Sequence, residues 1–277
     1  MLFDLQGCEA AIKDKFFIIR PMQKKLPLSV SLISFNEEDN IARTLISIKD
    51  IAAEIIVVDS HSTDETREIA KSYGARIFDE DWKGYIAQKN SAIEKCTEEW
   101  ILSLDCDEVV SRELEESIIE NIRNSEADGY FINRKTYYMG RFLKHAWQPD
   151  WKLRIVKRSA NPKWNGYHLH EILKISGSIK NLRGDLYHYS YKNLEDHFHR
   201  TVKYAKLSAK SYHDEGKKFK WYKYLLNPIL AFAKVFFIQR GFLDGYRGLI
   251  IAASSFTYTF LKYVFLWKIE RNNGSYL

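Results

Sequence analysis

The sequence predicts an α/β fold, with a mostly parallel sheet that carries helices on both faces, followed by a helical C-terminal region. Between residues 27 and 110, short apolar runs alternate with segments of helical periodicity, as in a doubly wound sheet with right-handed crossovers. Beyond residue 193, long helical and apolar stretches replace that alternation. We therefore expect an N-terminal extension over residues 1–26, an α/β domain over 27–192 and an amphipathic helical region over 193–277.

The parallel strands are predicted from apolar and β-branched runs that are too short for helices. Ser62 or Thr63 is placed to begin the second intervening helix, and Gly74 to end it. The expected strands are Leu28–Phe35, Glu54–Ser60, Ala75–Glu80 and Trp100–Leu104, and the expected helices include Asn36–Asp50, Gly84–Cys96 and Arg112–Asn124.

After Asn124 the pattern changes to segments that look like antiparallel strands able to extend the sheet, namely residues 129–140, 150–158 and 170–177. The reading is helical again from Leu194. Two further apolar stretches, Leu225–Ile238 and Leu249–Trp267, complete the chain. In the first of these C-terminal helices the residues expected near one face are Leu194, Phe198, Val202, Ala205 and Tyr212.

Composition narrows the class of protein. A chain of 277 residues with 45% hydrophobic and 28% charged residues is typical of a globular protein and not of a disordered or polytopic membrane protein. Residues 1–150 hold 19 Lys and Arg against 28 Asp and Glu, whereas residues 151–277 hold 23 against 8. The basic half therefore favours an anionic partner. Because aromatic and aliphatic residues are interleaved with its cations, we expect an anionic membrane surface and no nucleic acid.

Cysteine usage and the first residues give an expectation about the compartment. Cys8, Cys96 and Cys106 show no paired spacing with each other or with histidine, so neither a disulfide framework nor a zinc site is predicted. The first residues lack a basic segment followed by an apolar one, so we expect no secretory signal. A reducing cytosol fits both observations.

Two carboxylates at the end of a predicted strand are the main candidates for chemistry. Asp105 and Asp107 follow the apolar run ILSL, and carboxylates so placed can share a hard divalent cation that also binds diphosphate oxygens. A solvated loop is the alternative. We favour the metal interpretation because Asp79 and Asp81 form the same pattern without a buried strand before it.

Other polar residues follow neighbouring strands. Asp59 ends the run IIVVD, and Asn36 follows the first strand. Because ligands bind beyond the carboxyl ends of parallel strands, we expect Asn36, Asp59 and Asp105 to converge. Asp59 could accept a hydrogen bond from a uracil imide or a ribose hydroxyl, or it could serve a local turn.

Four motifs in order carry a family resemblance. SLISFNEEDNI, IIVVDSHSTDET, GYIAQKNSAI and ILSLDCDE together resemble the family 2 glycosyltransferases of the Rossmann-like GT-A fold. The later segments WQPDWKLRIVKR, YHLHEIL and LYHYSY are similar to the bacterial branch that modifies the lipopolysaccharide inner core, the β-1,4-glucosyltransferases acting on heptose. The resemblance runs from about Pro27 to the C-terminus.

The resemblance implies an inverting enzyme that moves a hexose from a nucleotide-sugar donor, with glucose from UDP-glucose as the expected donor. The implied acceptor is a lipid-linked saccharide such as the lipopolysaccharide core. The implied place is the cytoplasmic face of the inner membrane, with peripheral attachment. The apolar stretches near the C-terminus would then lie in the membrane interface, with Trp221, Tyr222, Tyr224 and Trp267 at headgroup level, although a buried helical core is the alternative.

The resemblance also implies roles for matched residues. The residue matching Asp59 recognises the nucleotide base, the one matching Asp105 contacts ribose or metal, and the one matching Asp107 coordinates Mg²⁺ or Mn²⁺ on the diphosphate. Asn36 and Glu37 would line the nucleotide pocket. Lys89, in the segment QKN, would contact the donor, unless it is an exposed helix lysine.

An inverting transfer needs a base that deprotonates the acceptor hydroxyl. Glu171 in HLHE stands where the family's acidic catalytic residue is expected, and His170 could orient it. The alternative for Glu171 is a salt-bridged residue at a sheet edge. His188 in LYHYS is a candidate third metal ligand, because imidazole accepts a divalent transition metal.

Two other classes of function remain open from the sequence. LSLDCDEVV also matches the nucleophile motif of haloacid-dehalogenase-like phosphatases, in which Asp105 would attack phosphorus and Asp107 would act as acid and base. A membrane-tethered scaffold without catalysis is the third class. The motif of such phosphatases normally opens its domain, whereas three expected strands precede Asp105 here, and a scaffold would need none of the acidic residues named above.

Overall fold

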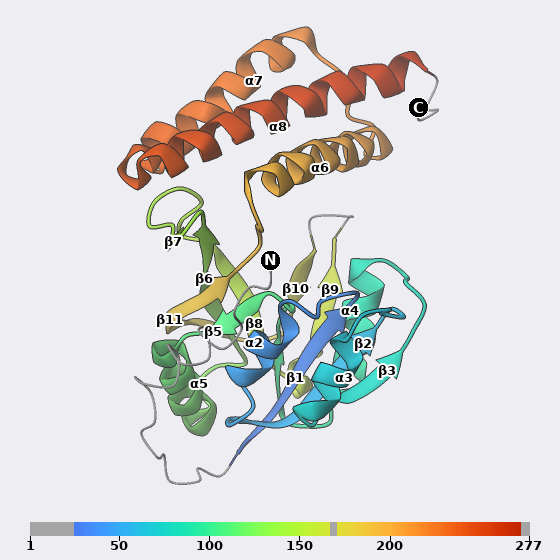
Figure 1. Ribbon diagram of the computed structural model, residues 1–277, viewed down its shortest axis with the longest axis vertical. Helices are drawn as coiled ribbons and strands as arrows, with labels where there is room; N and C mark the ends of the chain where they lie inside the picture. Colours follow the sequence, from blue (N-terminus) through green and yellow to red (C-terminus); the bar gives the residue numbers. More distant parts are fainter. Residues whose placement is uncertain (1–24, 167–170, 273–277) are drawn as a thin grey trace, which may run out of the picture.

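The computed structural model describes residues 25–166 and 171–272. It consists of a mixed α/β part at one end and a layer of three helices at the other (Figure 1). The central sheet has the order β3-β2-β1-β4-β8-β6-β11-β5, and β7 pairs with β6 beside this path. The α/β class and the helical C-terminal region predicted from the sequence are both confirmed.

The first half of the sheet is parallel, as expected. β1 pairs in parallel with both β2 and β4, and β2 pairs with β3, so the carboxyl ends of these strands share one edge. These strands are β1 (Leu26–Ser34), β2 (Ala52–Asp59), β3 (Arg76–Asp79) and β4 (Trp100–Ser103).

The second half of the sheet is mixed. β8 runs antiparallel to both β4 and β6, whereas β11 is parallel to β6 and antiparallel to β5. The predicted strand within residues 170–177 does not extend this sheet, because β10 pairs only with β9 in a separate two-stranded ribbon. The remaining strands are β5 (Glu108–Val110), β6 (Gly129–Tyr138), β7 (Arg141–Phe142), β8 (Trp151–Lys157), β9 (Lys163–Asn165), β10 (Ile172–Lys174) and β11 (Ile179–His188).

Helices of the α/β part cover both faces of the sheet. They are α2 (Ile41–Ile46), α3 (Thr66–Ser72), α4 (Tyr85–Glu94) and α5 (Arg112–Asn124), with a short 3-10 turn, η1 (Arg158–Ala160). Neither Ser62 nor Thr63 caps α3 as predicted, because the N-cap residue is Glu65 and the Ser62 hydroxyl instead donates to Asp59. Gly74 does follow the end of α3, with a φ of 77° that glycine adopts without strain.

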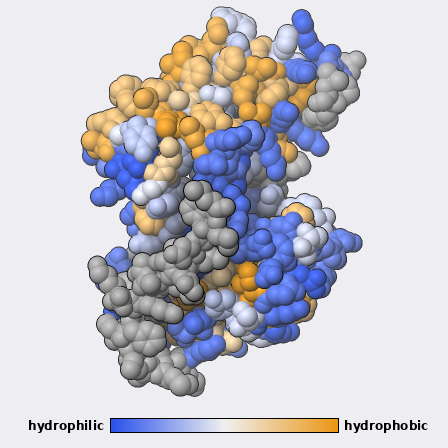
Figure 2. Space-filling view, viewed as in Figure 1, coloured by the Kyte–Doolittle hydropathy of each residue, from blue (hydrophilic) through white to orange (hydrophobic). Residues whose placement is uncertain are grey.

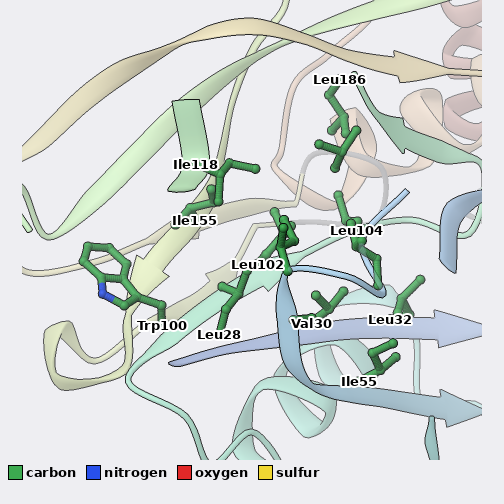
Figure 3. Close-up of a cluster of buried hydrophobic side chains, with 14 of the residues drawn as sticks. Leu28, Val30, Leu32, Ile55, Trp100, Leu102, Leu104, Ile118, Ile155 and Leu186 are labelled. Carbon is green, nitrogen blue, oxygen red and sulfur yellow. The ribbon is translucent and has the colours of Figure 1, made fainter. Parts of the chain in front are cut away.

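Alternating side chains of the parallel strands are buried on both faces of the sheet. Leu28, Val30 and Leu32 of β1 lie in the larger apolar cluster with residues of α2 and α5 (Figure 3). Ile56 and Ile101 lie in a second cluster on the side of α4 and β9. A sheet buried on both faces fixes its strand ends firmly, and the side chains that follow β1, β2 and β4 are therefore held in place.

The helical end consists of three long helices and two irregular turns. α8 lies between α6 and α7, and α6 lies nearest to the sheet (Figure 1). The face predicted for α6 is wrong in part, because Leu194 and Val202 are exposed and the buried side chains include His197 and Ser208. The elements are α6 (Leu194–Asp214), α7 (Trp221–Ala233), η2 (Lys234–Ile238), η3 (Gly241–Asp244) and α8 (Tyr246–Arg271).

A buried carboxylate joins the helical end to the α/β part. Asp244 at the end of η3 is almost fully buried and accepts hydrogen bonds from the backbone N–H groups of Lys144, His145 and Ala146, at 3.1, 3.0 and 2.8 Å. We expect Asp244→Asn to lower the free energy of unfolding by about 2 kcal/mol, because an amide N–H₂ would face these donors. Urea unfolding checks this against the exposed Asp214→Asn, and equal midpoints would contradict it.

Another contact between the two ends makes stability depend on pH. His197 of α6 is buried, its Nδ1 lies 2.6 Å from the Tyr138 hydroxyl, and burial lowers the pKa of His197 from 6.5 to about 4. Between pH 4 and pH 6.5, His197 binds a proton in the unfolded chain but stays neutral in the folded protein. Stability should therefore fall as the pH drops below 6.5, by up to about 3 kcal/mol at pH 4.

The measurement is urea unfolding at pH 7 and pH 5, on the wild type and on the double variant His197→Leu, Tyr138→Phe. The variant removes both hydrogen-bonding partners together, so no buried polar group is left unpaired. We expect a smaller loss of stability at pH 5 in the variant. An equal loss in both proteins would show that His197 does not contribute.

Candidate active site

The carboxyl ends of the parallel strands bring most of the predicted site residues to one edge of the sheet. Asp105 and Asp107 lie in the turn between β4 and β5. This turn is anchored by the Thr44 hydroxyl, which donates to the Cys106 carbonyl at 2.6 Å, and by the Asp105 backbone N–H, which donates to Glu108 Oε2 at 3.0 Å. The two carboxylates are therefore held on a fixed backbone.

Lys89 links Asp105 to Glu171, the predicted base. Its Nζ lies 2.9 Å from Asp105 Oδ1 and 3.1 Å from Glu171 Oε1, and the lysine side chain is almost fully buried. The alternative of an exposed helix lysine is therefore wrong. The Trp164 ring lies 4.6 Å from Lys89 Nζ, and its indole N–H is buried without a hydrogen-bond partner in the described part of the chain.

A buried ion-pair network supports Asp105 from the other side. Arg154 Nη2 lies 2.9 Å from Asp105 Oδ2 and 2.7 Å from Glu108 Oε1, and Arg134 also reaches Glu108. Burial by itself would raise the pKa of Asp105, but the cations of Lys89 and Arg154 hold it well below its usual value. Asp105 is therefore a carboxylate whose charge is already balanced by the protein.

The sequence reasoning missed this network. The sequence motifs point to neither Glu108 nor Arg134. The one available signal was Glu108 itself, a charged residue directly before the apolar pair Val109–Val110.

Asp107 lies beside a histidine from a distant strand. Its Oδ2 is 3.4 Å from His188 Nε2 at the end of β11, and the His188 Nδ1 atom is buried without a hydrogen-bond partner among the described residues. Burial would raise the pKa of Asp107, but His188 lowers it below its usual value. A carboxylate oxygen and an imidazole nitrogen suit Mn²⁺ and related ions.

Few side chains of the described residues are placed to bind a metal ion. Within residues 25–166 and 171–272 no group of three or more His, Cys, Asp or Glu side chains is arranged to hold a metal ion. Asp107 and His188 fit a cation that takes its remaining ligands from phosphate oxygens and water.

Asp59 and Asn36 form a second polar group, at the ends of β2 and β1. Asp59 is fully buried and accepts hydrogen bonds from the hydroxyls of Ser34 and Ser62, both at 2.6 Å, and from the Ser62 backbone N–H at 2.7 Å. The Ser62 hydroxyl also accepts from the Asn36 backbone N–H at 2.9 Å. The Asp59 carboxylate is therefore satisfied by donors of the protein and shapes the turn after β2.

Glu37, the residue after Asn36, is influenced electrostatically by Asp107. Burial raises its pKa, and the negative charge of Asp107 adds to this, while a hydrogen bond from Asn40 opposes it. Helix α4 provides another link, since Gln88 donates to the Ser60 hydroxyl at 3.2 Å and the next residue is Lys89. Lys89 thus joins Asp105 and Glu171, Asp107 contacts His188, and Ser62 joins Asn36 to Asp59. His170 lies outside the described residues.

The two tryptophans of the segment WQPDWKLRIVKR have different surroundings. Trp147 packs in an aromatic cluster with Tyr138, Tyr191 and His197. Trp151 is exposed. Trp147 therefore belongs to the contact between the sheet and the helical end.

The architecture defines the class of protein. A mannosyltransferase of Pyrobaculum calidifontis, solved in complex with GDP-Man and Mn²⁺, superimposes with a TM-score of 0.53 at 13% sequence identity, over 95% of this chain and 93% of its own. The fold is therefore that of the GT-A glycosyltransferases, with the Asp-Cys-Asp turn after the fourth parallel strand.

Sequence comparison identifies the family within that class. Residues 29–178 match the family model described as Glycosyl transferase family 2. An uncharacterised glycosyltransferase of Rickettsia typhi is 32% identical over 88% of this chain and 86% of its own, and the lipopolysaccharide core biosynthesis glycosyltransferase LpsC of Rhizobium meliloti is 30% identical over 87% and 92%. The chain belongs to glycosyltransferase family 2 and is a nucleotide-sugar-dependent enzyme. The phosphatase and scaffold alternatives are set aside.

Proposed function

We propose that this enzyme is an inverting transferase that moves a hexose, glucose from UDP-glucose, to a lipid-linked saccharide such as the lipopolysaccharide core. The observation that carries the proposal is the Lys89 ammonium, which joins Asp105 of the strand-end turn to Glu171. This contact places Glu171, a carboxylate that can act as the base, near Asp105, which belongs to the carboxylates that the family uses to bind its donor. The similarity to LpsC, named for lipopolysaccharide core biosynthesis, supports the choice of acceptor.

Glu171 acts as the base in this proposal. The acceptor hydroxyl loses its proton to the Glu171 carboxylate as its oxygen attacks the anomeric carbon, from the face opposite the leaving nucleotide diphosphate. Lys89 positions this carboxylate through its 3.1 Å contact. The buried ring of Trp164 packs beside Lys89 and helps to hold it in place.

The donor nucleotide binds at the ends of β1 and β2. Asp59 takes part in donor binding by holding the turn after β2 in place, and Asn36 and Glu37 line the nucleotide pocket. Asp105 contacts the ribose or the metal. Asp107 and His188 would hold a divalent cation, Mg²⁺ or Mn²⁺, which balances the charge of the donor diphosphate. The relevance of a metal is supported by the Mn²⁺ in the Pyrobaculum calidifontis enzyme.

The helical end attaches the enzyme peripherally to the cytoplasmic face of the inner membrane. Apolar side chains gather over α7 and α8, whereas the described residues of the α/β end that are visible on this face are mostly polar (Figure 2). Trp221, Leu230 and Ile238 are among the exposed large side chains of this end. By length and composition, α8 is the one helix in the described part of the chain that could cross a bilayer, but it packs between α6 and α7, which favours an interfacial position.

Three of the four aromatic residues expected at headgroup level fit this arrangement. Trp221 and Trp267 are exposed, as is Tyr222 beside Trp221. Tyr224 instead packs on Phe260, with ring centroids 4.9 Å apart, in the cluster between α7 and α8. Tyr224 is therefore removed from the set proposed to meet the membrane.

Calorimetric titration of the purified protein tests the donor. UDP, GDP, ADP and UDP-glucose are each added with Mn²⁺ and again with EDTA. We expect binding of UDP and UDP-glucose that is lost in EDTA. Metal-dependent binding of GDP alone would overturn the UDP-glucose assignment, and metal-independent binding would remove the role given to Asp107 and His188.

A further inference from the structure

A cavity with three cationic side chains is lined by residues outside the proposed sugar-transfer site. It has a volume of about 390 Å³ and lies where β6, the loop before β8 and the end of η2 meet. The residues that line it are Asn133, Lys135, Lys144, His145, Gln148, Pro149, Ile238, Gln239 and Arg240. None of these residues is part of the proposed donor or base site.

The cavity is basic. Lys135, Lys144 and Arg240 contribute three permanent cations, and the nearby carboxylate of Asp185 is already paired with Lys135 at 2.8 Å. In the described parts of the chain, neither Lys144 nor Arg240 has a carboxylate within ion-pairing distance. An anion that enters the cavity would therefore meet two cations without a counter-charge.

The walls of the cavity are held in place by buried contacts. The backbone N–H groups of Lys144 and His145 donate to the buried Asp244, and the Trp147 N–H donates to Gln239 Oε1 at 3.2 Å. The loop and the end of η2 are thus fixed to each other before any ligand arrives. A preformed site loses less conformational entropy on binding.

One wall of the cavity continues into the apolar surface of the helical end. Ile238 lines the cavity and is 78% exposed. Phe237 beside it is also exposed, as are Phe242, Leu243 and Tyr246 just beyond Arg240. A free phosphate or a nucleic acid would leave this apolar surface in water. A phosphate on an acyl chain would use both the cations and the apolar wall.

We propose that this cavity binds the phosphate of an anionic phospholipid headgroup, while the acyl chains pass beside Ile238 and Phe237. The proposal rests on the peripheral membrane attachment given above but not on the identity of the sugar. Lys144 and Arg240 pair with the phosphate, whereas the charge of Lys135 is balanced by Asp185. The contact would fix how the enzyme is oriented on the bilayer.

The test is sedimentation of the full chain with vesicles of phosphatidylcholine alone and of phosphatidylcholine with phosphatidylglycerol. The variant is Lys144→Gln with Arg240→Gln. The control is Lys218→Gln with Lys220→Gln, which removes the same charge from exposed lysines beside Trp221. We expect the wild type to prefer phosphatidylglycerol vesicles, the cavity variant to bind them about 20-fold more weakly, and the control to lose clearly less.

Each other outcome would contradict a specific part of the proposal. Wild-type protein that binds neither vesicle overturns the membrane attachment and the lipid site together. If the wild type binds the vesicles and the cavity variant and the control lose the same amount of affinity, only the lipid site is overturned. The attraction to the membrane is then due to the overall positive charge of the surface. The second experiment is a titration with inorganic phosphate in the absence of lipid. If the cavity variant lost phosphate binding but still bound vesicles as the wild type does, the cavity would be assigned to free phosphate.

Discussion

Replacement of Glu171 by glutamine is expected to lower the turnover of sugar transfer by about 10²- to 10⁴-fold, the usual contribution of a general base. Glutamine keeps the size of the side chain and an oxygen that can accept from Lys89 Nζ, 3.1 Å away in the wild type, but it cannot take the proton of the acceptor hydroxyl. Donor affinity should stay within about threefold, since glutamine preserves the surroundings of Asp105. Turnover with UDP-glucose and calorimetry with UDP measure the two quantities.

Glu126→Gln is the matched control, because Glu126 also pairs with a lysine, Lys180, at 2.8 Å, but is exposed. It should leave turnover unchanged. A Glu171→Gln enzyme with normal turnover would remove Glu171 as the base. An enzyme that loses donor binding and turnover together would assign Glu171 to the donor site through Lys89.

Replacement of Asp107 by alanine is expected to weaken Mn²⁺-dependent donor binding by more than about 100-fold, and turnover should fall with it. The change removes one of the two side chains that fit the metal and leaves His188 without its 3.4 Å neighbour. Loss of an outer partner of a metal ligand alone typically costs 10- to 100-fold in affinity, so the loss of a ligand should cost more. Calorimetry with UDP, with Mn²⁺ and with EDTA, measures the effect.

The chain contains its own control for this change. Asp81 belongs to the second Asp-x-Asp sequence, and its side chain is 92% exposed. Asp81→Ala should bind UDP and Mn²⁺ as the wild type does. If Asp107→Ala kept metal-dependent binding, the cation would have to be held by other side chains, and the pairing of Asp107 with His188 would be structural.

The parallel half of the fold could be predicted because local signals agree with the tertiary structure there. Helix α5 begins and ends at the predicted residues, Arg112 and Asn124, with Ser111 capping its first turn. The strands β1, β2 and β4 were recognised because a sheet buried on both faces needs continuous apolar runs. The strand ends then placed Asp59 and Asp105 without further information.

The second half of the sheet could not be predicted in the same way. β11 pairs with β6 and β5, so its neighbours come from residues far away in the chain, and periodicity carries no information about such pairings. For the same reason the contact of Asp107 with His188 was only a candidate. The network of Arg154, Glu108 and Arg134 forms only after β8 and β6 have paired next to β4.

The face of α6 was mispredicted because its partners are polar. His197 forms a hydrogen bond with the Tyr138 hydroxyl, and the Ser208 hydroxyl forms one with the Tyr258 hydroxyl at 2.6 Å. Buried hydrogen bonds of this kind replace apolar contacts on the inner face. A search for apolar periodicity alone therefore chose Leu194 and Val202, which face water.

The single ammonium of Lys89 has a consequence for experiment. Because one cation serves both Asp105 and Glu171, a change at either carboxylate alters the electrostatic field at the other. Double-mutant cycles between these two positions should therefore show non-additive effects on turnover. In the proposed mechanism, donor binding and acceptor activation are therefore coupled through the Lys89 ammonium.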